Sequence, residues 1–241
     1  MKAQLITPVV LVCNDEYFLP YALEASRGFF KRYVIYDVGS SDRTRDIIDW
    51  FHKSNPEATF YVKVWPMLAP SIQGAFRNSM IAETLTEYYF ILDGDEVYSP
   101  ESYEAIVKGA ETLLTERKLY GLVRRIEVGA DMKSAYGLSM KTPHHRLYHR
   151  TAIWTGPHPG EVPYFPQKPP VEEWIEGATC YHFHNCERSS RDEDVPKRIE
   201  RRARPTYRPG EAAPLDLLGA LPLLKNPIAD FAPTPRLAQM Q

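Results

Sequence analysis

The sequence predicts a single α/β domain with a mostly parallel central sheet and helices on both of its faces. Two observations lead to this fold class. Over the first half of the chain, short apolar segments alternate with segments whose apolar residues recur at helical spacing. Strands that alternate with helices form parallel sheets with right-handed crossovers. The 241 residues, of which 44% are hydrophobic, are enough for a full core.

Four strands and four helices are predicted in the first half, in alternating order. The strands are short apolar or alternating runs at residues 9–13, 33–37, 59–65 and 88–92. The helices are predicted at residues 16–30, 41–51, 72–85 and from residue 100 onward. Ser41 and Asp42 are suited to cap the second helix. Ser99 is suited to cap the fourth, with Pro100 in its first turn and Glu101 beside its positive end.

The pattern changes after about residue 118. Strands are predicted at residues 119–126, 146–149 and 179–183, without regular helices between them and with long loops that contain Pro and Gly. We expect residues 1–190 to form one domain, with halves of about 1–118 and 119–190 and a smaller mixed sheet in the second half. Residues 191–241 form a charged, then Pro-rich extension that we expect to pack on the domain. Its leucines between residues 215 and 224 favour docking on the body over a homodimer contact or a membrane contact.

The composition excludes several classes of protein. A net charge of −2 gives no reason to expect a nucleic-acid partner. No apolar run approaches the roughly 20 residues that span a bilayer, and the first residues lack the layout of a signal peptide. The three cysteines are Cys13, Cys180 and Cys186, a sparse and odd set that favours a reducing compartment. The expected location is cytoplasmic, without a transmembrane segment.

An acidic motif follows the strand at residues 88–92. It consists of Asp93, Gly94, Asp95 and Glu96. Ligands of open α/β sheets bind at the carboxyl ends of parallel strands. Three acids placed there repel one another unless a cation lies among them, and carboxylates suit Mg²⁺, Mn²⁺ or Ca²⁺. The motif therefore predicts a metal that holds a phosphorylated ligand, although acids at this position are also common as a polar loop start.

A second cluster of metal-binding residue types lies at residues 180–186. In an extended strand, Cys180, His182, His184 and Cys186 share one face. One interpretation is that a histidine from this cluster completes the metal site of the acidic motif. The other is a structural zinc site, although four ligands along one extended strand do not easily surround a tetrahedral ion.

Several segments, in this order, resemble glycosyltransferase family 2, whose fold is the GT-A type. Residues 9–16 resemble the opening strand and loop of that family, and residues 36–44 resemble its Asp-Asp-Gly-Ser-x-Asp-x-Thr turn, with Val38 in place of the second Asp. Arg77 and Asn78 resemble its Ala-Arg-Asn element. The Asp93-Gly94-Asp95 triplet falls at the position of its metal-binding Asp-x-Asp motif. The resemblance covers roughly residues 5–100 well.

The resemblance implies a metal-dependent transferase that moves a sugar from a nucleotide-sugar donor, with UDP-sugar favoured over GDP- and dTDP-sugars. The expected metal is Mn²⁺ or Mg²⁺, bound by Asp93, Asp95 and a histidine of the second half, with His184 favoured over His182. Asp37 is expected to accept from an N–H of the base, Gly39 to allow a positive φ angle or a close backbone approach, and Arg77 to reach the phosphates or the sugar. The full set of expected donor-binding residues is Val12, Asn14, Glu16, Asp37, Gly39, Arg77, Asp93 and Gly94.

The acceptor is expected to be a saccharide or a small hydroxyl compound. Residues 154–161 resemble a Trp-x-Gly-x-x-His-Glu segment of the family, although Pro159 and Gly160 separate His158 from Glu161. Transfer with inversion needs a base near the acceptor hydroxyl, and Glu161 and His158 are the candidates, with Asp131 behind them. Transfer with retention needs no such base. Trp154 is either a stacking platform for a sugar or a core residue.

Residues 197–204 are strongly basic. A solvent-exposed helix with Glu–Arg pairs is favoured there over a lid whose cations approach the donor diphosphate. Two other functions are weighed for the whole chain. One is a nucleotidyltransferase that makes a sugar nucleotide, which would need a Gly-rich basic loop after the first strand. The other is a non-catalytic zinc- or carbohydrate-binding protein built around residues 180–186.

Overall fold

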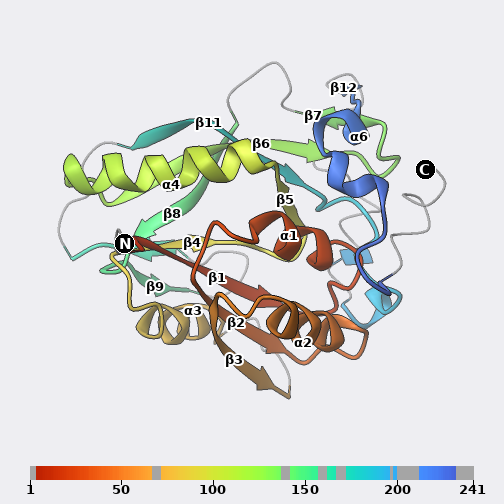
Figure 1. Ribbon diagram of the computed structural model, residues 1–241, viewed down its shortest axis with the longest axis horizontal. Helices are drawn as coiled ribbons and strands as arrows, with labels where there is room; N and C mark the ends of the chain where they lie inside the picture. Colours follow the sequence, from red (N-terminus) through yellow and green to blue (C-terminus); the bar gives the residue numbers. More distant parts are fainter. Residues whose placement is uncertain are drawn as a thin grey trace.

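The structure is a computed structural model that describes residues 4–66, 72–136, 142–156, 162–166, 172–195, 198–199 and 212–231. Its first half follows the predicted alternation closely (Figure 1). The elements of this half are β1 Ile6–Val12, α1 Leu19–Ser26, β2 Arg32–Val38, α2 Thr44–Ser54, β3 Thr59–Trp65, α3 Gln73–Ala82, β4 Tyr88–Ile91, β5 Glu96–Tyr98 and α4 Pro100–Thr115. Ser99 caps α4 as predicted, because its side chain accepts from the backbone N–H of Ser102.

Among the described residues of the second half, strands are the main regular element. They are β6 Tyr120–Val128, β7 Ser134–Tyr136, β8 Pro143–His149, β9 Ile153–Thr155, β10 Val162–Tyr164, β11 Glu173–His182 and β12 Ala213–Pro214, followed by the short helices α6 Leu217–Ala220 and η4 Pro222–Lys225. The short helix η2 Asp192–Asp194 precedes β12. Several strands of this half have only two or three residues.

One ten-stranded sheet joins the two halves. Along its path the order is β12-β7-β6-β8-β4-β1-β2-β3, and β11 pairs with both β6 and β5. The strands β3, β2, β1 and β4 are parallel, whereas β8 runs antiparallel to β4 and to β6. The mixed part expected for the second half is therefore continuous with the parallel part. A separate two-stranded sheet consists of β9 and β10.

The sheet separates two apolar cores. On one face, α1, α2 and α4 pack against Val10, Val12 and their neighbours. On the other face, α3 packs against Val9 and Leu11. This alternation along β1 arises because successive strand residues point to opposite faces. A strand that is buried on both faces is apolar throughout, which explains why β1, β2 and β4 were predicted to within a few residues.

A third core joins the C-terminal part of the described chain to α1. Leu217, Leu221 and Leu224 are buried there against Phe18 and Phe183. The hydroxyl of Tyr21 also donates to the carbonyl of Asn226 at 3.2 Å. The leucine-rich segment thus docks on the body, as its apolar pattern indicated. The division of the chain at residue 190 stays a prediction.

Among the helices of the described residues, none combines the length and the apolar character that crossing a membrane requires.

Candidate active site

A cavity of about 820 Å³ lies at the carboxyl ends of β1, β2 and β4. This volume is within the range of sites that bind small molecules and cofactors. Four aromatic residues of the second half line it, and they are Tyr120, Tyr148, Trp154 and Phe165. Its charged lining includes Arg77, Asp93, Asp95, Arg146, His182, His184, Arg188 and Arg198. The cavity thus has an aromatic side and a side rich in ionised groups.

The acidic loop reaches the cavity because β4 ends at Ile91 and the chain turns back into β5. Gly94 is needed in this turn, because a Cβ atom there would lie 2.8 Å from Cβ and 2.9 Å from Cγ of Asp15. The absence of a side chain at residue 94 lets the β1 loop and the β4 loop approach each other. Gly94 therefore has a structural role in bringing Asp15 beside Asp95.

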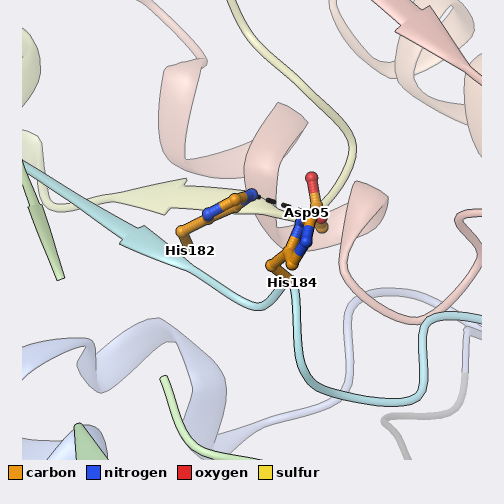
Figure 2. A group of neighbouring side chains, drawn as sticks. All are labelled: Asp95, His182 and His184. Atoms are coloured by element: carbon orange, nitrogen blue, oxygen red, sulfur yellow. Dashed lines mark ion pairs between the residues drawn. The ribbon is translucent and has the colours of Figure 1, made fainter. Parts of the chain in front are cut away.

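Three residues form a group that can hold a metal ion (Figure 2). Asp95, His182 and His184 each offer one ligand atom, and these atoms all lie within 4.8 Å of one another. Asp95 comes from the loop before β5, whereas the histidines come from the end of β11 and the residues after it. The two segments meet because β11 pairs antiparallel with β5, with His182 opposite Glu96. The donor set is one carboxylate and two imidazoles, which fits Mn²⁺ better than the oxygen-only preference of Mg²⁺.

Glu127 orients His182 from the neighbouring strand. Residues 127 and 182 are register partners in the parallel pair of β6 and β11. The Glu127 carboxylate lies 3.0 Å from Nδ1 of His182, while Nε2 of the same ring lies 3.5 Å from Oδ2 of Asp95. A carboxylate behind a ligating histidine fixes the ring and its tautomer in many metal sites. Burial alone would lower the pKa of His182, but Asp95 and Glu127 outweigh it and raise that pKa to about 10.

Arg188 bridges two buried carboxylates at the same place. Its Nη1 lies 2.6 Å from Oδ2 of Asp95, and its Nε donates to Oδ1 of Asp15 at 2.8 Å. Burial alone would raise the pKa of Asp95, yet Arg188 and His182 hold it well below its usual range. The Asp95 carboxylate is therefore ionised and neutralised by side-chain cations in this structure.

Asp93 and Glu96 are neutralised by a different arginine. Arg146, on β8, donates to Oδ2 of Asp93 at 2.9 Å and also forms an ion pair with Glu96. Glu96 in addition faces Nε2 of His144 at 2.7 Å. A cation was expected among the three acids, and the arginine side chains Arg146 and Arg188 supply positive charge there in this structure. Asp93 lines the cavity but is not a member of the group of Asp95, His182 and His184.

Arg77 lies in the cavity wall, and its expected contact with the phosphates or the sugar of a donor stays a prediction. It is buried, its Nη2 lies 3.6 Å from Oδ1 of Asp93, and its guanidinium carbon lies 5.2 Å from the centroid of a Trp154 ring. Trp154 itself is mostly buried, and its indole N–H donates to the Tyr89 hydroxyl at 2.8 Å. These contacts make Trp154 a core residue with one side on the cavity, rather than a free stacking platform.

The other expected donor-binding residues differ in whether they line the cavity. Val12 lines the cavity. Asp37 is fully buried, and its two oxygens accept from the backbone N–H of Ser40 and from Nε of Arg45. Gly39 has the positive φ that was anticipated, 98°. The base-binding role of Asp37 stays a prediction, and it would require the carboxylate to exchange one of these two donors.

Asn14 and Glu16 hold the segment that follows β11. The side chain of Asn14 donates to the carbonyl of Arg191, and the carboxylate of Glu16 accepts from the backbone N–H of Ser190 at 2.6 Å. Neither side chain lines the cavity. Their contacts therefore position residues 188–191 over the β1 loop, and contact with a donor stays a prediction for both.

The proposed catalytic bases lie outside the described residues. This applies to both His158 and Glu161. Asp131, which was placed behind them, is exposed and accepts from Ser134 Oγ at 2.8 Å within its own turn. It does not line the cavity.

The four residues of the alternative zinc site do not converge. Cys180 lies in the core beneath α4 and groups with Glu96 and His144, whereas Cys186 lies in the core around Phe18. Burial raises the pKa of the Cys180 thiol well above its usual value, which disfavours the thiolate that zinc requires. Within the described residues, the histidines join Asp95 instead of the cysteines.

The basic segment contains one residue whose expected exposure was wrong. Arg198 is buried, and its Nη2 lies 3.0 Å from Oδ1 of Asp15 and donates to the carbonyl of Cys13 at 2.5 Å. Lys197 and residues 200–204 lie outside the described residues. The charge of Arg198 therefore faces the cavity and not the solvent. The carbonyl of Cys13 and the buried carboxylate of Asp15, both in the β1 loop, attract it.

The first half of the chain is similar to a known protein family. Residues 8–116 match the sequence model of the family described as Glycosyl transferase family 2. The match covers somewhat less than half of the chain, and over these residues the chain is similar to that family. The matched residues begin within β1, run past the end of α4 and include Asp93 and Asp95. In a search of curated proteins, none matches the chain.

Solved structures with a similar arrangement are glycosyltransferases of low sequence identity. Residues 1–349 of S. aureus TarS are 16% identical with a TM-score of 0.46, over 61% of this chain and 47% of that one. Glucosyl-3-phosphoglycerate synthase from Mycobacterium tuberculosis, in complex with Mn²⁺, UDP and phosphoglyceric acid, is 16% identical with a TM-score of 0.44, over 64% and 60%. The mannosyltransferase PcManGT from Pyrobaculum calidifontis, in complex with GDP-Man and Mn²⁺, is 15% identical with a TM-score of 0.41, over 51% and 35%. The chain thus spans about half the length of the TarS fragment.

Three site residues were not found by sequence reasoning. Glu127, Arg146 and Arg188 all reach the acidic loop from the second half of the chain. Glu127 and Arg146 lie on strands whose pairing partners the sequence does not reveal. Arg188 has a weak signal, since it follows His184 by four residues at the start of a charged stretch.

Proposed function

We propose that this protein is a metal-dependent glycosyltransferase that transfers a sugar from a nucleotide-sugar donor to a hydroxyl acceptor. The observation that carries the proposal is the group of Asp95, His182 and His184, which lies in a cavity at the strand ends of a family 2 stretch. The second carboxylate behind His182 supports a metal role for this group. A UDP-sugar is the donor we favour, and the acceptor is a saccharide or another small hydroxyl compound.

Asp95, His182 and His184 would hold the metal, with Mn²⁺ favoured over Mg²⁺ because two of the three ligands are imidazoles. When bound, the metal acts as a Lewis acid that offsets charge on the leaving diphosphate. Asp93 faces the same cavity with Arg77 and Arg146 on either side. These two arginines hold the acidic loop in place and bring positive charge to the region where a diphosphate would bind.

The aromatic residues Tyr120, Tyr148 and Phe165 line the other side of the cavity. Rings of this kind suit the apolar faces of a sugar or of a base. The acceptor base proposed from sequence, Glu161 or His158, follows β9 along the chain, and β9 carries the cavity residue Trp154. An inverting reaction would use one of these residues to take the proton of the acceptor hydroxyl.

A donor screen tests this function. The protein is incubated with UDP-, GDP- and dTDP-sugars, each with Mn²⁺ and with EDTA, and release of the nucleoside diphosphate is measured. We expect slow hydrolysis or transfer with one nucleotide class, lost in EDTA and in the variant Asp95→Asn. The matched control is Asp49→Asn, an exposed acid on α2 away from the cavity. Failure of every donor class in the presence of Mn²⁺, with the protein folded, would contradict the proposal.

A further inference from the structure

Arg188 lies at the position of a cation in the candidate metal group. Its Nη1 is closer to Oδ2 of Asp95, at 2.6 Å, than Nε2 of His182 is, at 3.5 Å. A metal bound by Asp95, His182 and His184 needs the lone pairs of that carboxylate. The guanidinium and a divalent cation are therefore rivals for one group.

A second anchor keeps Arg188 in the cavity when it leaves Asp95. Its Nε and Nη2 both donate to Oδ1 of Asp15, at 2.8 and 2.5 Å. The Asp15 side chain is almost completely buried, and Arg198 shares the same oxygen at 3.0 Å. A guanidinium is a rigid plane with five donors, so the contacts of Nε and Nη2 with Asp15 can persist while another anion replaces the Asp95 oxygen at Nη1.

The anion that suits a freed Nη1 is a diphosphate. Arg188 and Arg198 line the same cavity as Asp93 and Asp95, and guanidinium groups bind phosphate oxygens through charge-assisted hydrogen bonds. A metal bound at Asp95 would also bring the donor diphosphate to this point. Nη1 of Arg188 would then pair with the Asp95 carboxylate before the metal binds and with the diphosphate afterwards.

We propose that Arg188 holds the place of the divalent cation at Asp95 and is released toward the donor diphosphate when the cation binds. Two consequences follow. Arg188 weakens binding of the metal alone, and it strengthens binding of a nucleoside diphosphate to the metal-loaded protein. The second consequence rests on the glycosyltransferase function proposed above, whereas the first does not.

The metal arm of the test measures Mn²⁺ alone by electron paramagnetic resonance, without nucleotide. Arg188→Gln is expected to bind Mn²⁺ about tenfold more tightly than wild type, the factor that corresponds to one strong polar contact. Arg198→Gln removes a charge that shares Asp15 but does not touch Asp95, and Arg191→Gln removes an exposed charge of the same segment. Both controls are expected to stay within about threefold of wild type, as expected for charges that do not compete for Asp95.

Equal or weaker Mn²⁺ binding in Arg188→Gln would overturn the proposal. An equal gain in Mn²⁺ affinity in Arg188→Gln and Arg198→Gln would also overturn it. The loss of any positive charge near the site would then explain both gains. If Arg188→Gln does not fold, Arg188→Lys takes its place, since a lysine keeps the charge but cannot bridge two carboxylates with a planar fork. Binding tighter than wild type by Arg188→Lys supports the proposal, and binding at or below wild type overturns it.

The nucleotide arm uses UDP, GDP and dTDP at saturating Mn²⁺ in a titration calorimeter. The nucleotide that wild type binds is expected to bind Arg188→Gln about tenfold more weakly. Unchanged affinity would overturn the diphosphate half of the proposal. Absence of binding to wild type by all three nucleotides would contradict the proposed function, while the metal arm would still decide the competition at Asp95.

Discussion

The buried carboxylate of Asp95 lies beside Arg188 and His182, and the ring of His182 is held by a second carboxylate, that of Glu127. The contacts at 2.6 Å from Arg188 and 3.5 Å from His182 explain why the pKa of Asp95 lies well below its usual range despite burial, which alone would raise it. Glu127 completes this arrangement from β6. At the scale of residues, positive and negative side chains therefore alternate in the order Arg188, Asp95, His182 and Glu127. Each of these charges influences the ionisation of its neighbour.

Replacement of Glu127 by Gln tests the positioning of His182. The amide keeps the size of the side chain but loses the negative charge that holds the ring, so we expect Mn²⁺ affinity to fall about 10- to 100-fold. The measurement is Mn²⁺ binding by calorimetry. Glu104→Gln, which changes an exposed acid on α4, is the matched control and is expected to bind as wild type does. Equal affinity in both variants would show that Glu127 does not act through His182.

Element by element, the site depends on two loops and one strand end that pairing brings together. The β4–β5 loop supplies Asp95, the end of β11 supplies His182, and the loop after β11 supplies His184. The helix α4 packs across β11 behind them. A direct link is the backbone N–H of Thr179, which donates to Oγ of Ser102 on α4 at 3.1 Å. The helix stabilises the strand without contributing a residue to the cavity.

The cap of α4 gives a prediction at this scale. Ser99→Ala removes the side chain that accepts from the backbone N–H of Ser102, and we expect a loss of about 1 kcal/mol in the free energy of unfolding. Ser99→Asp keeps an acceptor at the cap and is expected to remain within about 0.5 kcal/mol of wild type. Urea denaturation measures both, and Mn²⁺ affinity is expected to be unchanged. A loss of metal affinity in Ser99→Ala would mean that α4 has more influence on the site than its packing indicates.

The elements predicted for the first half lie within a few residues of their predicted positions, and the strands predicted at residues 119–126, 146–149 and 179–183 correspond to β6, β8 and the end of β11, whereas the short strands of the second half were not predicted. The strands β1, β2 and β4 are buried on both faces, and a continuous apolar run is a direct sign of that environment. The strands β7, β9 and β10 have three residues each, which is too short for a periodic pattern. The sequence identified the acids and histidines by residue type. It could not identify Glu127 or Arg146, because their places depend on which strands lie beside β11 and β4.

For the whole molecule, the C-terminal part of the described chain packs in one core against α1 and the segment that follows β11. Leu224 is fully buried in the core that contains Phe18, Val97 and Phe183. Because Val97 and Phe183 flank Asp95 and His182 in sequence, this core supports the loop and strand end that carry the site. The extension therefore contributes to global stability as well as to the site.

Leu224→Ala tests this contribution. Truncation of a buried leucine leaves a cavity, and we expect a loss of about 2–5 kcal/mol in the free energy of unfolding. Leu114→Ala changes a leucine on α4 that is 43% exposed, and a loss below about 1 kcal/mol is expected there. Chemical denaturation of both variants provides the comparison. Equal losses would show that the extension does not pack as a true core.

The most direct test of a metal-dependent nucleotide-sugar transferase is calorimetric titration of UDP into wild type and into Asp95→Asn, with Mn²⁺ and with EDTA. We predict micromolar binding to wild type with Mn²⁺, at least tenfold weaker binding in EDTA, and a similar loss in Asp95→Asn even when Mn²⁺ is present. UDP affinity that is the same in all four combinations would contradict a metal site at Asp95. Absence of binding by UDP, and by GDP and dTDP in the same titration, would contradict the glycosyltransferase function itself.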